Sequence, residues 1–547
     1  MQTPAAAAAP TMSTLFVNGA LFDGFRHVPR GEVLVTDGVV AALGPPGSLD
    51  AGDAEVVDLA GGLLCPGFVD AHVHAVQGGL ERVRCDLTGA EGRAAYVRRV
   101  KAYADQNPDV AWILGGGWAM AAFPGGTPTA ADLDAVVADR PVFLPNRDHH
   151  GAWVNSKALE LAGIDADTPD PPHGRVERDP QGRPTGTLHE AAMHAVSRLI
   201  PETSDAEYDA ALREAQRYLH ACGITGWQDA IVGSYAGMGD PGPSYVRAAE
   251  RGELTAYVVG ALWWDRDRGA EQVAELIARR TDLARPGFQP TTVKIMQDGV
   301  AENFTAAMID PYLDRAGQAT TNSGHSFVEA SALRTYVAEL DANGFQVHIH
   351  AIGDRGVREA LDAFHGTDPG NRHHIAHLQV VHPRDRSRFA ELGVSANLQM
   401  LWACYDEQMI DLTLPYLGSE RAGWQYPFGD LHRAGARLVA GSDWPVSSPD
   451  PLAAIHVAVT RMEHAGRGRA GTDPFLPAQA LPLAVAFGAY TSGSAWINHR
   501  DDAGVLRPGA VADLVVLDRD PFTGPVDGIG ATRVRSTWIG GTVVFHA

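Results

Sequence analysis

Apolar and polar residues alternate in short runs at both ends of the chain. From Thr14 to Leu64, runs such as "TLFVNGALFDG" and "GEVLVTDGVVAALG" are separated by Gly and Asp, a pattern typical of antiparallel strands joined by turns. The same pattern returns near the C-terminus in "GVLRPGAVADLVVLDRDP" and "VRSTWIGGTVVFHA". Neither end has enough strands for a stable core of its own. We therefore predict that residues 13–66 and 500–547 join into one small β-sandwich.

Between these ends, apolar strands alternate with amphipathic helices. The run Phe68–His74 comes first, and seven more follow from Ile224 onward: "ITGWQD", "AYVVGALWW", "TTVKIMQDG", "FQVHIHAIGD", "HHIAHLQ", "VSANLQ" and "ARLVAGSDWP". One helix has clear limits, because it begins with a capping box from Ser204 to Glu207 and stops at Gly223. Eight such units predict an α/β fold, a TIM (β/α)8 barrel over residues 67–79 plus 201–499. Its active site would lie at the C-terminal ends of the strands.

Two segments do not fit the barrel pattern. Residues 80–200 separate the first two barrel strands and are too long for a plain loop, so we predict an inserted subdomain near the barrel mouth. Residues 1–12 are rich in Ala and Pro and lack the basic start of a signal peptide. We expect them to form a disordered tail.

Net charge and cysteine content limit the classes of binding partner and the cellular compartment that we expect. The 547 residues carry a net charge of −22, which argues against binding to nucleic acid or to anionic membrane surfaces. No apolar run approaches the roughly 20 residues that a membrane span needs. The four cysteines are far apart and form no CxxC pair, as expected for a reduced cytoplasmic protein. A small-molecule substrate is the expected partner, and a homo-oligomer is left open.

Metal-ligand residue types stand at the ends of several predicted strands. His72 and His74 are two apart and therefore share one face of the first strand. Alone this pair is a weak signal, because histidines also occur in ordinary cores. Four later strands add Lys294, His350, His377 and Asp443 near the same end of the barrel. Together these residues predict a divalent metal site.

Lys294 is the unusual member of this set. It lies between Val293 and Ile295, where a charged, unpaired ammonium would be costly to bury. One interpretation is an ion pair with a nearby carboxylate. The other is an amine that has condensed with CO2 to give a carbamate, an anionic oxygen ligand able to bridge two metals.

Other residues near the strand ends have competing interpretations. His348 shares a face with His350, and we expect His373 to share one with His377; both are interpreted as packing or supporting residues. Val439, Gly441 and Asp443 are expected to share the face that presents the carboxylate. The alternative is that Asp443 only caps the following turn.

Five of these segments, in order, resemble strand signatures of the amidohydrolase superfamily: "PGFVDAHVH", "VKIMQDG", "HIHAIGD", "HHIAHLQ" and "GSDWPV". The insertion, with "DHHGAWVNSKALELAGI" and "GRVERDPQGRPTGTLHE", resembles the branch that contains the N-substituted formamide deformylases. The resemblance implies six metal-site residues: His72, His74, Lys294, His350, His377 and Asp443. In that assignment the first two hold one metal, the lysine is a carboxylated bridge, and the next two hold a second metal. Asp443 would take the proton from the attacking water.

The resemblance also suggests a function and leaves alternatives. Zinc, as one or two ions, is the default metal, although imidazole and carboxylate ligands also suit Mn, Fe or Co. The expected reaction is hydrolysis of a non-peptide C–N bond, such as an N-formyl or cyclic amide. Hydrolysis of a lactone or ester, and isomerisation or decarboxylation at the same metal site, stay open because fold does not decide reaction. A non-catalytic binding protein is disfavoured, since all six positions are filled.

Two residues of the insertion are candidates for contact with substrate. Trp118 stands in "GGGW", and His150 matches the family histidine before "WVNS". For both, the alternative is packing within the insertion, because an inserted segment need not touch the substrate.

Overall fold

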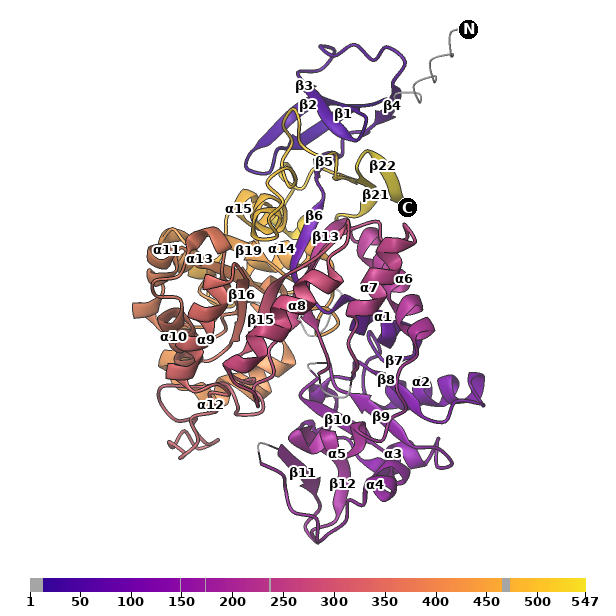
Figure 1. The fold of residues 1–547 in the computed structure, drawn as a ribbon, viewed down its shortest axis with the longest axis vertical. Helices are drawn as coiled ribbons and strands as arrows, with labels where there is room; N and C mark the ends of the chain where they lie inside the picture. Colours follow the sequence, from indigo (N-terminus) through magenta and orange to yellow (C-terminus); the bar gives the residue numbers. More distant parts are fainter. Residues whose placement is uncertain (1–12, 148, 173, 236–237, 465–472) are drawn as a thin grey trace.

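Eight parallel strands with intervening helices form the centre of the molecule (Figure 1). The computed structural model describes residues 13–147, 149–172, 174–235, 238–464 and 473–547, so the predicted tail at 1–12 lies outside the described residues. The strands pair in chain order from first to last. They are β6 (Phe68–Val73), β13 (Ile224–Val232), β14 (Tyr257–Trp263), β15 (Phe288–Met296), β16 (Gln346–Ala351), β17 (His374–His377), β18 (Ser395–Leu398) and β19 (Leu438–Ala440). The predicted barrel is confirmed.

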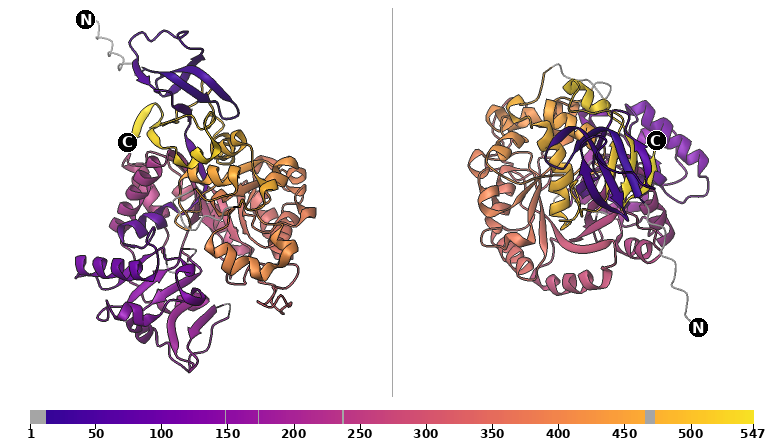
Figure 2. Two further views of the ribbon diagram at one scale, coloured as in Figure 1. Left: turned by 180° about the vertical axis from the view of Figure 1, so that it is seen from behind. Right: turned by 90° about the horizontal axis from the view of Figure 1, so that it is seen from above.

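Helices surround this sheet, as the view from above shows (Figure 2). The predicted capping box is present at the start of α6, where the Ser204 side chain accepts from Glu207 N and the Glu207 side chain accepts from Ser204 N. The helices of this part are α1 (Ala75–Val83), α6 (Asp205–Ala221), α7 (Gly242–Glu250), α8 (Val273–Leu283), α9 (Ala330–Ala342), α10 (Asp354–Ala363), α11 (Arg388–Leu392), α12 (Leu414–Ala422), α13 (Phe428–Arg433), α14 (Pro451–Thr460), α15 (Leu483–Gly488) and α16 (Ser494–Ile497).

The barrel closes without a regular ladder between β19 and β6, as far as the described strands show. Instead, Asp443 N donates to His72 O and His74 N donates to Trp444 O, both at 2.8 Å. The Asp70 carboxylate reinforces the seam, because its Oδ1 accepts from Ser442 N at 3.0 Å. Gly441 permits this approach: a Cβ at that position would lie 2.5 Å from the Cβ of His72. The first and last strands are thereby brought into contact.

Strands from both chain ends share a second sheet, which lies at the top of Figure 1. Pairing between β5 and β20 joins the ends, with Cys65 opposite Val515. Apolar residues of both ends, including Phe16, Leu514 and Trp538, fill one core. The prediction that the two ends combine is confirmed. The strands are β1 (Ser13–Phe22), β2 (His27–Thr36), β3 (Val39–Gly44), β4 (Glu55–Asp58), β5 (Leu63–Pro66), β20 (Leu514–Leu517), β21 (Val534–Ile539) and β22 (Thr542–His546).

The segment inserted between β6 and β13 forms a third sheet at the bottom of Figure 1, away from the terminal sheet. Its strand order is β11-β12-β10-β9-β8-β7. The elements are β7 (Cys85–Asp86), α2 (Arg93–Gln106), β8 (Ile113–Gly116), α3 (Ala130–Asp134), β9 (Val142–Pro145), β10 (Gly151–Val154), α4 (Ser156–Ala162), β11 (Gly174–Arg178), β12 (Pro184–Glu190) and α5 (His194–Ser197). Among the described residues, no helix is both long enough and apolar enough to cross a membrane.

Candidate metal centre

All six predicted ligands line one cavity at the C-terminal ends of the barrel strands. His72 stands near the end of β6 and His74 directly follows it. His350 and His377 belong to β16 and β17, Lys294 belongs to β15, and Asp443 follows β19. The fold therefore brings together residues that are up to 371 positions apart, from His72 to Asp443.

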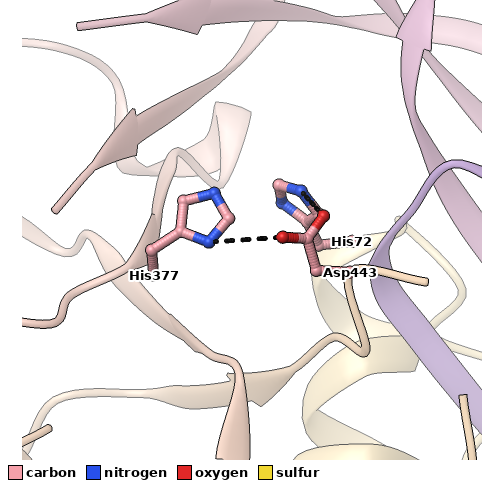
Figure 3. A group of neighbouring side chains, drawn as sticks. All are labelled: His72, His377 and Asp443. Atoms are coloured by element: carbon pink, nitrogen blue, oxygen red, sulfur yellow. Dashed lines mark ion pairs between the residues drawn. The ribbon is translucent and has the colours of Figure 1, made fainter. Parts of the chain in front are cut away.

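The tightest group within this cavity is His72, His377 and Asp443, whose ligand atoms all lie within 4.8 Å of one another (Figure 3). Asp443 Oδ1 is 3.1 Å from His72 Nε2 and 3.0 Å from His74 Nε2. Asp443 Oδ2 is 3.8 Å from His377 Nδ1. Three imidazoles thus converge on a single carboxylate.

The facing atoms in this group are poorly satisfied. His72 Nε2, His377 Nδ1 and Asp443 Oδ1 are buried and have no well-aligned hydrogen bond within the described residues. Buried polar atoms are normally paired, because burying them without a partner costs free energy. A cation among these nitrogen and oxygen donors would satisfy them together. The residues present therefore fit a divalent metal such as zinc.

The protonation states also suit metal binding. Burial lowers the pKa of His72 to about 3, and the charge of Lys294 adds to the effect. Burial likewise lowers the pKa of His377 well below its ordinary value. Burial alone would raise the pKa of Asp443, but His72, His74 and His377 outweigh it and hold that pKa well below its usual range. The site thus favours neutral imidazoles and an ionised carboxylate, the forms that bind cations.

A turn, and not a strand, positions Asp443. Strand β19 ends at Ala440, and Asp443 has a φ of 56°. The expected common strand face for Val439, Gly441 and Asp443 is therefore wrong, and Gly441 makes room for His72 instead. Ser442 holds the turn, since its Oγ accepts from Trp444 N at 3.0 Å. Within the described residues, no backbone N–H donates to Asp443 Oδ1, which weighs against a capping role.

His350 and Lys294 occupy another part of the same cavity. His350 Nε2 lies 3.3 Å from Gly299 O and 3.4 Å from Asp298 Oδ1. Asp298 is buried and accepts from Ile352 N and Gly353 N, so it connects the ends of β15 and β16. Lys294 is buried without an ion pair among the described residues, and burial lowers its pKa to about 7. The salt-bridge interpretation of Lys294 thus finds no partner there.

A buried polar chain supports His72 from inside the barrel. His72 Nδ1 and His348 Nε2 are 2.9 Å apart, and His348 Nδ1 lies 2.7 Å from Gln228 Oε1. The same Gln228 oxygen lies 3.1 Å from His374 Nε2. A ligand whose second nitrogen is held in this way has a fixed ring orientation. The supporting role expected for His348 agrees with this contact.

His373 does not share a face with His377. Its ring stacks on Phe364 and its Nε2 lies 2.9 Å from Asp341 Oδ1, outside the cavity. His374 points to the barrel interior instead. The regular alternation fails because His377 has a φ of 80°, which turns the end of the strand. The expected face for His373 is therefore corrected, whereas its packing role is retained.

The two predicted residues of the insertion have different positions. His150 lines the cavity. Trp118 is buried in the insertion, where its Nε1 donates to Leu144 O at 2.7 Å and its ring contacts Phe123 and Trp153. Trp118 is not among the residues that line the cavity, so it adopts the packing alternative.

Several cavity residues were not predicted. Aromatic walls are formed by Tyr235 and Trp263, whose rings lie 4.6 Å apart, and by Trp402, which stacks on His377. Asp298 contacts His350 but is not among the residues that line the cavity; it stands inside the quoted "VKIMQDG" signature, so its sequence signal was present. Tyr235 and Trp263 carried none.

Comparison with known proteins identifies the family of this chain. The profile of the amidohydrolase family matches residues 55–545. The chain belongs to the amidohydrolase family. This amidohydrolase is 29% identical to a Bacillus subtilis protein named "Putative amidohydrolase YtcJ", over 98% of this chain and 100% of the relative. It is 26% identical to the N-substituted formamide deformylase of Arthrobacter pascens, over 95% and 96% of the two chains.

A solved structure extends the comparison. An uncharacterized metal-dependent hydrolase from Pyrococcus furiosus superposes with a TM-score of 0.70 and 26% identity, covering 93% of this chain and all of that one. Family, structural neighbour and buried ligand cluster agree that this amidohydrolase is a metal-dependent hydrolase.

The metal centre generates a direct prediction. The double variant His72→Ala/His74→Ala should lose most of the divalent metal that the wild type retains, because it removes two nitrogen donors from the group around Asp443. Elemental analysis of protein purified without chelator measures this. The control is His373→Gln, a buried histidine outside the cavity, which should keep its metal. Equal metal content in all three proteins would refute the assignment.

Proposed function

We propose that this amidohydrolase hydrolyses the C–N bond of small, uncharged, non-peptide amides, with N-formyl and cyclic amides as the first candidates. The observation that carries the proposal is the convergence of unsatisfied imidazole nitrogens on Asp443 inside a cavity with aromatic walls. No arginine is among the cavity-lining residues in the described part of the chain, and Lys294 is their only lysine. A carboxylate-bearing substrate would therefore lack a cationic side-chain partner. Full-length similarity to an N-substituted formamide deformylase supports the N-formyl class.

Different residues of the cavity would have different roles in hydrolysis. His72, His74 and Asp443 would hold one cation, His350 and His377 a second, and a carboxylated Lys294 would bridge the two. When bound, such a cation acts as a Lewis acid and lowers the pKa of a coordinated water to about 7. Asp443, ionised and facing the cavity, would take a proton from the attacking water on a carboxylate oxygen. It would then deliver that proton to the departing nitrogen.

The compartment is proposed on a separate observation. Cys65, Cys85 and Cys404 are buried and form no disulfide. This state suits a reducing compartment, so we propose a cytoplasmic enzyme.

A substrate panel tests the proposed function. Metal-loaded protein should hydrolyse neutral secondary formamides such as N-benzylformamide, or neutral cyclic amides, because these fit a cavity without a cationic side chain for an acid group. N-formyl amino acids should react at least about tenfold more slowly, since an unpaired carboxylate must lose its hydration. Chelator-treated protein is the control. Benzyl formate and lactones test the C–O alternative, and hydrolysis of these esters with no amide turnover would reject the proposal.

The role of Asp443 is tested by Asp443→Asn. Asparagine keeps the shape of the side chain but cannot accept a proton from water, so kcat should fall by about 10²- to 10⁴-fold. The folded structure should persist, as measured by thermal unfolding. The matched control is Asp450→Asn: Asp450 caps α14 through Leu452 N and Ala453 N, and asparagine caps nearly as well. Near-normal turnover by Asp443→Asn would remove the residue from the mechanism.

Lys294 is expected to carry a carbamate in metal-loaded protein. Its buried amine meets no carboxylate ion-pair partner in the described residues, and condensation with CO2 converts it to an anionic oxygen donor with release of one proton. Native mass spectrometry should show the added mass of one CO2, lost in Lys294→Ala but kept in Lys157→Ala, an exposed lysine. Short carboxylic acids should partly restore activity to Lys294→Ala. A bare amine paired with a carboxylate in metal-replete crystals would exclude the carbamate.

A further inference from the structure

The insertion contributes His150 to the cavity wall, and the carboxylate of Glu190, also from the insertion, contacts this histidine. His150 Nδ1 lies 3.0 Å from Glu190 Oε1 and 3.1 Å from Oε2. The two residues are also joined through the backbone, because Glu190 N donates to His150 O at 3.0 Å. The six predicted metal-site residues come from the barrel, whereas His150 and Glu190 come from a separate sheet. The cavity is therefore assembled from two parts of the chain.

Barrel residues hold the Glu190 carboxylate in place. Thr305 Oγ1 donates to Glu190 Oε1 at 3.2 Å, and Asn303 Nδ2 donates to the same oxygen at 3.3 Å. Both donors belong to the turn after β15, the strand that carries Lys294. Gly299 O, at the start of this turn, receives His350 Nε2 at 3.3 Å. The position of Glu190 is thus fixed relative to the metal-site residues.

The Glu190 carboxylate determines which ring nitrogen of His150 carries the hydrogen. Burial would raise the pKa of Glu190, but His150, Asn303 and Thr305 together lower it, so the group is ionised at neutral pH. An ionised carboxylate accepts a hydrogen bond from Nδ1–H and thereby fixes that tautomer. In the neutral ring, Nε2 is then a hydrogen-bond acceptor. His149, the other insertion histidine in the cavity, has Gln77 and Glu81 next to its ring nitrogens.

The backbone at the pair is itself constrained. Glu190 has a φ of 51°, a conformation that non-glycine residues rarely adopt. Such a conformation costs free energy and persists only where surrounding contacts enforce it. Here the contacts are those of the carboxylate to the insertion and to the barrel turn. These contacts therefore hold Glu190 in a backbone conformation that it would otherwise rarely adopt.

We propose that His150 accepts the N–H hydrogen of the scissile amide at Nε2, and that Glu190 is the positioning residue that orients it. This inference rests on the proposed amide hydrolysis. It assigns a substrate class, amides that bear an N–H, because esters, lactones and N,N-disubstituted amides lack that donor. The barrel ligands would direct the carbonyl group, and the insertion would recognise the nitrogen.

The experiment compares matched substrates that differ only at the nitrogen. The substrates are the best secondary amide of the panel, its N-methyl counterpart and the ester with the same substituent. The readout is the ratio of kcat/KM for the secondary amide to kcat/KM for its N-methyl counterpart or for the ester. Because the same substrates are used with every protein, differences in their intrinsic reactivity cancel when this preference is compared between proteins. His150→Phe should reduce this preference by about 10- to 100-fold, the usual effect of one lost hydrogen bond to a buried polar group. Turnover of the N-methyl amide and the ester should change little.

Variants of Glu190 test positioning. Glu190→Gln keeps an oxygen acceptor for Nδ1 and should retain part of the preference, whereas Glu190→Ala should resemble His150→Phe. The double variant His150→Phe/Glu190→Ala should be no worse than either single variant, because Glu190 acts through His150. If Glu190→Ala does not fold, Thr305→Val and Asn303→Ala loosen the same carboxylate and should lower the preference in the same direction.

A matched control comes from the same sheet. Glu177 Oε2 lies 3.4 Å from His189 Nε2, a second histidine–carboxylate pair of the insertion that does not line the cavity. Glu177→Gln should leave the preference unchanged. Metal content should be equal in all variants. An amide-hydrolysing wild type whose preference survives His150→Phe would overturn this inference alone. A wild type that hydrolyses no amide would overturn the proposed function and, with it, this inference.

Discussion

The contact between the end of β6 and the turn after β19 holds the metal centre together. Without it, His72 and Asp443 would belong to opposite edges of an open sheet. Two backbone hydrogen bonds and the Asp70 carboxylate close the ring, where a side chain at position 441 would clash with His72. The contacts that close the barrel are few and do not form a regular ladder, and they lie next to His72 and Asp443. Catalytic geometry and barrel integrity therefore depend on the same few atoms.

This coupling explains why the barrel interior is polar beneath the site. A core of His348, Gln228 and His374 offers less apolar burial than aliphatic residues of the same size would. Its hydrogen bonds, however, fix the ring of His72 in one orientation. Satisfied buried networks define a single arrangement because every displaced member leaves another without a partner. The polar core thus contributes less to the stability of the fold, but it orients the ring of His72 before any cation binds.

The fold, and the cavity that the six candidate ligands share, were predictable from the sequence because both follow from local patterns. Period-two runs indicated the terminal strands, and apolar runs indicated the barrel strands. Ligand-type residues at the ends of five barrel strands indicated the cavity. The prediction failed where the backbone leaves regular geometry. Positive φ angles at His377 and Asp443 break the alternation from which side-chain direction is inferred. His373 and Gly441 were consequently assigned wrong neighbours, while the identity of the ligand positions did not depend on that alternation.

The insertion was the least predictable part, for a different reason. Its contributions to the cavity come from residue pairs far apart in sequence, such as His150 with Glu190 and Glu190 with Thr305. No periodic pattern encodes such contacts, and "GGGW" looked as suitable for the cavity as "DHH" did. In the proposed mechanism, the cation ligands come from the barrel strands and from the residues that directly follow them. In the same proposal, His150 of the insertion meets the nitrogen of the substrate, and Glu190 orients it. We therefore expect the inserted sheet and the turn after β15 that contacts it to determine which substrates this amidohydrolase accepts. The residues of the barrel would carry out the hydrolysis.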